Sequence, residues 1–152
     1  MIGILSLLLL VSAACGLGQT GVRPRVTQSQ EATFDRAKYV GLATVLYSIG
    51  HNGTYPVGKS TAEIFKKLAP YVKSKNAFES ENPNGKHFLF NLSISGLKAS
   101  DVKRPQAVIV AYDEKPWPDN SRIAVFGDGH VEKLLPATWK VVAQSLKFSA
   151  KR

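Results

Sequence analysis

The most regular pattern of apolar positions runs from Glu31 to Ile49, where apolar side chains recur every three to five residues. An α-helix completes a turn every ~3.6 residues, so this spacing predicts a helix with one buried side. The predicted buried stripe comprises Phe34, Ala37, Leu42, Val45, Leu46 and Ile49, and the predicted polar side comprises Gln30, Asp35, Arg36 and Lys38. Gly50 and the turn-forming segment 51–56 are expected to end the helix.

A second, shorter helix is expected from Ser60 to Leu68, since Ser60 is a good N-cap and Glu63 follows at the capping-box spacing. Beyond it the apolar period changes to two, which indicates strands. The predicted strands are Phe88–Leu92, Ala107–Tyr112, Arg122–Phe126 and His130–Leu134. The second of these is nearly all apolar, which favours a central position in the sheet.

The Asp128-Gly129 pair between the last two strands predicts a β-hairpin with a primed turn, which requires positive φ. A last amphipathic helix is expected over Ala137 to Phe148, with Trp139, Val142, Ala143 and Leu146 on one side. The pattern as a whole predicts an α+β fold: a long N-terminal helix packed on a small antiparallel sheet, with a C-terminal amphipathic helix.

The N-terminal segment Met1 to Val11 is a leucine-rich apolar run, and small residues follow it up to Ala14. It matches the core of a secretion signal and is short for a permanent membrane helix. We therefore expect a signal peptide at 1–14, a polar tether at 15–30 and one folded domain at 31–152. The run resembles a bacterial lipoprotein signal, which implies lipidation of Cys15 and a membrane-anchored lipoprotein of the cell envelope. Plain cleavage after Ala14, giving a secreted protein, and retention of the segment as an anchor are the alternatives.

The chain carries a formal net charge of +9, and none of its charged residues lies in 1–14. A basic surface attracts nucleic acid, anionic lipid and acidic polymers alike. Most lysines are scattered along the sequence, which indicates a solvated exterior. Positive charge is concentrated only at the end of the chain, at Lys140, Lys147, Lys151 and Arg152.

No catalytic pattern is present: the sequence holds no G-x-S-x-G elbow, phosphate-binding glycine loop or H-E-x-x-H zinc motif. We therefore predict a protein that is not an enzyme and that uses neither a cofactor nor a metal. The acidic residues Asp113, Glu114, Asp119 and Asp128 are interpreted as solvated loop charges and not as a calcium cage. His130, next to the Asp-Gly pair, is interpreted as a surface residue.

Trp117 lies between Pro116 and Pro118, a rigid setting with Tyr112 nearby. An exposed aromatic ring there would offer a platform for a partner. The alternative is that Trp117 covers the edge of the sheet.

Three motifs follow one another in the order of a known family: the segments 47–56, 68–73 and 126–131, which read YSIGHNGTYP, LAPYVK and FGDGHV. With them, the chain from Glu31 to Leu135 resembles the globular part of bacterial type II secretion pseudopilin-like (prepilin-type) proteins. The resemblance implies a pilin-like fold and a structural role. The short basic leader and assembly helix of prepilins are replaced here by the lipoprotein-like signal.

Two functional hypotheses result. The first is a non-catalytic, exported cell-envelope protein that acts through contacts with envelope or secretion-system proteins, in a secretion- or pilus-type structural role. The second is a basic extracellular binding module for a polyanion such as DNA or an acidic wall polymer, using Lys140, Lys147 and Lys151. Binding of the second kind weakens steeply as salt rises.

Overall fold

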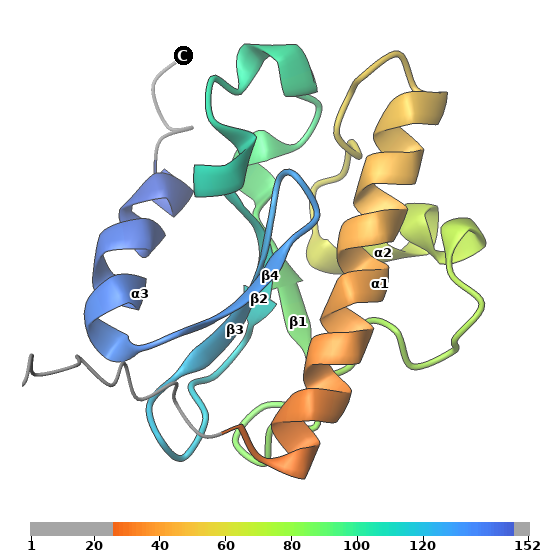
Figure 1. Ribbon diagram of the computed structural model, residues 1–152. Coiled ribbons are helices and arrows are strands. Elements are labelled where there is room, and N and C mark those ends of the chain that lie inside the picture. The colour runs from red at the N-terminus through yellow and green to blue at the C-terminus, as the bar shows by residue number, and fades with distance from the viewer. Residues whose placement is uncertain (1–25, 148–152) are drawn as a thin grey trace, which may run out of the picture.

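The computed structural model describes residues 26–147 (Figure 1). The helices are α1 (Gln28–Gly50), α2 (Thr61–Leu68) and α3 (Pro136–Val142), and a 3₁₀ turn (Ala143–Lys147) continues α3. The strands are β1 (Phe88–Phe90), β2 (Ile109–Asp113), β3 (Arg122–Phe126) and β4 (Val131–Leu134). Within this part of the chain, no helix is long and apolar enough to cross a membrane.

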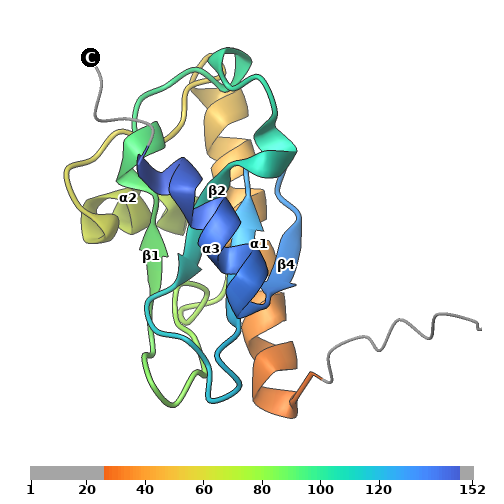
Figure 2. The ribbon, with the colours of Figure 1, turned by 90° about the vertical axis from the view of Figure 1, so that its left-hand side faces the viewer.

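The four strands form one antiparallel sheet in the order β1-β2-β3-β4, so that neighbours in sequence are neighbours in space. Helix α1 covers one face of the sheet and α3 covers the other, while α2 lies beside α1 on the side of β1 (Figures 1 and 2). The predicted α+β architecture, with an N-terminal helix on a small antiparallel sheet, is confirmed.

Side chains of β3 alternate between the two faces, as a pleated strand requires. Ile123 and Val125 pack with Ala37 and Val40 of α1. Ala124 and Phe126 point the other way and pack with Trp139, Val142 and Leu146. The predicted apolar side of the C-terminal helix therefore does cover the sheet.

Helix α1 begins three residues earlier than predicted. Thr27 is its N-cap: the Thr27 hydroxyl accepts from the Gln30 N–H at 3.2 Å, and the Thr27 N–H donates to the Gln30 side chain at 3.1 Å. Gln30, the second residue of this reciprocal capping box, is buried. The expectation that Gln30 ends a tether and belongs to a polar helix side is wrong.

The predicted buried stripe of α1 is also wrong in part, because Leu42, Leu46 and Ile49 are exposed. The side that faces the sheet carries small residues, among them Ala37, Gly41 and Thr44. A Cβ on Gly41 would lie 2.6 Å from the carbonyl oxygen of Gly129. Small side chains let the helix approach the sheet closely, and the larger apolar side chains are left outside.

The β3–β4 hairpin forms where it was predicted, with a different turn. The Gly129 N–H donates to the Phe126 carbonyl at 2.9 Å, and the Phe126 N–H donates to the His130 carbonyl at 2.9 Å. Gly129 has φ of +90°, and Asp128 is not among the described residues with positive φ. This is a three-residue loop with one left-handed glycine, which replaces the predicted two-residue primed turn.

The remaining elements differ from the predictions at their ends. β1 stops at Phe90, since Asn91 turns the chain and its amide donates to the Ile109 carbonyl at 2.7 Å. β2 begins at Ile109 because the preceding residues form a 3₁₀ turn that starts at Pro105. β2 is an internal strand, as its apolar run predicted.

Candidate interaction surface

The outward side of α1 carries four large apolar residues, Tyr39, Leu42, Leu46 and Ile49, which we call the α1 seam. Leu46 is 39% exposed and Ile49 is 71% exposed. They follow one another at spacings of three, four and three residues, so they line up along one side of the helix. Such an alternation of three and four is the spacing at which a second helix packs against the first.

The α1 seam lies in an uncharged stretch of the helix. Residues 39–50 contain no Lys, Arg, Asp or Glu, although the chain as a whole carries +9. The seam is therefore a neutral apolar strip on a basic protein. Scattered single apolar residues on a surface need no explanation, whereas a contiguous apolar strip is typical of an interaction site.

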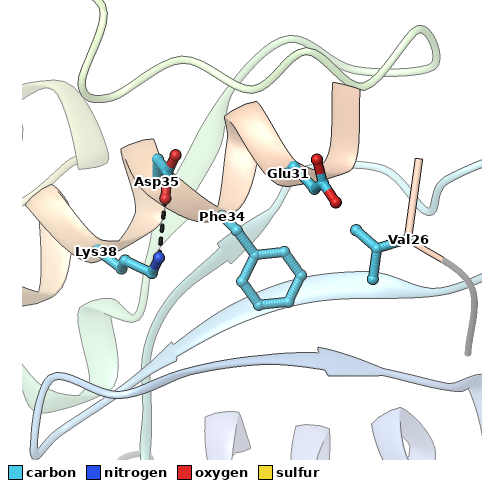
Figure 3. Close-up of a pocket in the computed structure, with 5 residues that line it drawn as sticks. All are labelled: Val26, Glu31, Phe34, Asp35 and Lys38. Carbon is cyan, nitrogen blue, oxygen red and sulfur yellow. Dashed lines mark hydrogen bonds and ion pairs between the residues drawn. The ribbon is translucent and has the colours of Figure 1, made fainter. Parts of the chain in front are cut away.

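A hollow of about 440 Å³ lies at the N-terminal half of the same helix (Figure 3). Its lining includes Val26, Glu31 and Phe34, and the ring of Phe34 points into the centre of the view. Asp35 and Lys38 border it and form an ion pair at 2.8 Å. Exposed ion pairs of this kind contribute little to stability. The hollow therefore has charged residues at its edge. It lies on the helix turns that precede the α1 seam.

Trp117 is not the exposed platform considered from the sequence, because its side chain is buried, with 3% exposure. It packs with Ala37, Phe88 and Ile123 beneath α1. Its indole N–H donates to the carboxylate of Asp113 at 2.7 Å. The ring belongs to the core between α1 and the sheet.

Asp113 is fully buried, which contradicts its interpretation as a solvated loop charge. Its carboxylate also accepts from the Ser80 hydroxyl at 2.7 Å and from the Ile123 N–H at 2.8 Å. Burial raises the pKa of Asp113, and these hydrogen bonds offset only part of that rise. The carboxylate accepts three hydrogen bonds in all. Through Trp117 and Ser80 it links the β2–β3 connection to the loop before β1.

A second polar cluster ties the start of α1 to the sheet. Asp119 accepts from Lys133 at 2.7 Å and from the Ser121 hydroxyl at 2.5 Å, and the amide of Gln30 donates to it at 3.3 Å. Burial alone would raise the pKa of Asp119, but the hydrogen bonds from Lys133, Ser121 and Gln30 lower it far below its ordinary value. This cluster fixes the orientation of α1, and with it the direction in which the α1 seam faces.

Asp128 and His130 interact within the β3–β4 turn, with His130 Nδ1 at 2.5 Å from the carboxylate. The imidazole stacks on Phe126, with ring centroids 4.3 Å apart. Burial opposes ionisation of Asp128, but the hydrogen bonds from His130 and the attraction between the two side chains together lower the pKa of Asp128. In residues 26–147 no group of three or more His, Cys, Asp or Glu side chains is arranged to hold a metal ion.

The other residues singled out from the sequence are not brought together into one site. Tyr112 is half-buried and packs against Trp139, with ring centroids 5.3 Å apart. Lys140 is exposed on α3. Cys15, Lys151 and the side chain of Lys147 lie outside the described part of the chain. Binding of a polyanion at the C-terminal end therefore stays a prediction.

Comparison of the chain with protein-family models, with curated proteins and with solved structures gives no match. A functional argument for this chain therefore depends on its own residues. The most distinctive feature of its surface is the α1 seam, of which the sequence pattern had placed Leu42, Leu46 and Ile49 in the core.

Proposed function

We propose that this chain is a non-catalytic, exported protein of the cell envelope whose pseudopilin-like domain acts through protein–protein contacts, with the α1 seam as the contact surface. The exposed run of Tyr39, Leu42, Leu46 and Ile49 carries this proposal. The sequence resemblance to pseudopilin-like proteins supports it, because that resemblance implies a structural role. Lipidation of Cys15 would hold the domain at the membrane.

The occupant of the seam is a second copy of the same helix. The spacing three-four-three reads the same in both directions, so an antiparallel partner places Tyr39 opposite the second copy's Ile49, and Leu42 opposite its Leu46. A two-fold contact of this kind is self-complementary. Because residues 39–50 carry no formal charge, two copies meet there without like-charge repulsion in the contact itself.

The expected affinity is low. Four partly exposed side chains per copy bury well below the ~1,000 Å² that a stable interface needs. Confinement to a membrane by a lipid at Cys15 would raise the effective concentration of the copies and compensate for this weakness. We therefore propose a contact that is weak between copies in solution and that forms when the copies are confined to a membrane.

The experiment compares the full-length chain with the double variant Leu42→Lys, Ile49→Lys by sedimentation velocity over a wide range of concentrations. The wild type is expected to show a concentration-dependent rise in sedimentation coefficient, and the variant is expected to remain monomeric. Both substitutions lie at exposed positions, so the far-UV circular dichroism should be unchanged.

The matched control is Ser100→Lys, Thr138→Lys, which adds the same charge at exposed positions away from α1. It should associate like the wild type. Equal loss of association in the two variants would show that net charge and not the seam controls association. A wild type that stays monomeric both in solution and when tethered to vesicles would refute the proposed contact.

A further inference from the structure

A second hollow, which we call the basic groove, lies between α2 and the segment that follows it, and it shares no lining residue with the α1 seam. Its volume is about 400 Å³. Phe65, Val72 and Phe78 supply an apolar floor, and the two phenylalanine rings stack with centroids 4.6 Å apart. All three side chains are half-buried, so part of each remains accessible from the hollow.

The rim of the basic groove is formed by Lys66, Lys73 and Lys75, all of which are exposed. Within residues 26–147, none of the three ammonium groups makes a hydrogen bond or an ion pair. Their neighbour Lys67 differs, because its ammonium donates to the Val57 carbonyl at 2.6 Å. The three rim lysines are therefore free to meet an external anion.

The distribution of charge along the sequence also favours an anionic ligand at the basic groove. Residues 59–75 contain five lysines and one acid, Glu63, which gives this segment a net charge of +4 out of +9 for the chain. The carboxylate of Glu63 is already engaged, since it accepts from the Lys59 N–H at 2.8 Å. A positive potential over an apolar hollow attracts a ligand that is both apolar and anionic.

We infer that the basic groove binds an acidic peptide segment of a partner protein, with one large apolar side chain anchored on Phe65 and Phe78 and flanking carboxylates on the rim lysines. The hollow is open to solvent and so does not enclose a small molecule, whereas small-molecule sites bury most of their ligand. A single side chain with polar flanks suits the shape of the hollow, as at the anchored centre of many interfaces.

The test uses a fluorescein-labelled ten-residue peptide with one central phenylalanine and glutamates on both sides, titrated with the full-length chain at low salt and read by fluorescence anisotropy. The protein variant Lys73→Gln, Lys75→Gln should weaken binding by up to roughly twenty-five-fold, because each lost charge contact of this kind is worth up to about a factor of five. The matched control Lys98→Gln, Lys103→Gln removes two exposed lysines elsewhere and should bind within a factor of two or so of the wild type.

The apolar part of the inference is tested by Ala69→Trp, which fills the groove from an exposed lining position and leaves every lysine in place. It should weaken the peptide as strongly as loss of the two lysines does. A peptide with alanine in place of the phenylalanine should lose affinity for the wild type and show little response to Ala69→Trp.

Equal weakening by the two lysine pairs would overturn the inference, because attraction to the net charge would then explain the binding. Stronger binding of a single-stranded oligonucleotide, or of vesicles with an anionic headgroup, at the same lysines would also overturn it, in favour of those ligands. No detectable peptide binding at millimolar concentration would overturn it outright. None of these outcomes depends on the α1 seam.

Discussion

Replacement of Asp113 by alanine would remove the acceptor for three buried donors at once: the Ser80 hydroxyl, the Trp117 indole N–H and the Ile123 N–H. A buried donor without a partner costs about 1–3 kcal/mol. Three such donors would cost about 3–9 kcal/mol, but removal of a buried charge offsets part of this cost. The expected loss in free energy of unfolding is therefore about 3–4 kcal/mol. This is a large fraction of the 5–15 kcal/mol that is typical of a whole domain.

Asparagine at the same position should cost much less, about 1 kcal/mol, because its amide oxygen can still accept from Trp117 and Ile123. The two variants also differ in pH dependence. The folded-state pKa of Asp113 is raised above 3.8 by burial, so the stability it contributes is complete below pH 3.8 and decreases as pH rises through the folded-state pKa. The deficit of Asp113→Asn relative to the wild type should therefore be larger at acid pH than at pH 7.

Urea unfolding, followed by circular dichroism and tryptophan fluorescence at several pH values, measures both effects. A cost below about 1 kcal/mol for Asp113→Ala would show that the network does not hold the β2–β3 connection. Equal costs for alanine and asparagine would show that the lost acceptor is not the cause.

Two further effects on stability follow from close contacts. Gly41→Ala places a Cβ 2.6 Å from the Gly129 carbonyl oxygen, so thermal unfolding should show a loss of about 1–2 kcal/mol, whereas Gly50→Ala, with its nearest neighbour at 3.6 Å, should be neutral or slightly stabilising. Asp119→Asn should cost about 1–2 kcal/mol at pH 7 after discount for exposure, since it removes the carboxylate that binds Lys133. The lowered pKa of Asp119 means that its contribution is present above pH 3.8 and is lost as pH falls, so the cost of Asp119→Asn should vanish in acid.

The apolar run of β3 was predictable from the sequence. β3 has the predicted bounds, because each of its residues belongs to one of two well-covered faces. The end of β1 was missed because an asparagine side chain, and not a glycine or proline, turns the chain there. Local sequence does not reveal which carbonyl such an amide will reach.

The buried side of α1 could not be predicted from apolar periodicity. The helix is apolar on both sides, and its sheet-facing side is built from residues such as Gly41 and Thr44, whose hydrophobic signal is weak. Large side chains dominate a sequence pattern, so Leu42 and Leu46 were assigned to the core. The same error concealed the α1 seam.

The buried polar contacts depend on residues far apart in sequence, whereas the basic groove depends on a bend in one short segment. Ser80 reaches Asp113 across 33 positions, and nothing near either residue indicates that they meet. The rim lysines are close in sequence, but α2 ends and the chain bends between Lys66 and Lys73, so the sequence alone does not reveal that they surround one hollow. Folding brings them around one hollow.

The most direct test of the central claim is cross-linking between two differently tagged, membrane-bound copies of the full chain, one carrying Leu42→Cys and the other Leu46→Cys. An antiparallel contact through the α1 seam predicts that a short bismaleimide joins position 42 of one copy to position 46 of the other. It also predicts fewer links between two Leu42→Cys copies, whose thiols lie a helical turn apart. Equal yields for these pairs and for an off-seam pair, Ser100→Cys with Thr138→Cys, would contradict the account.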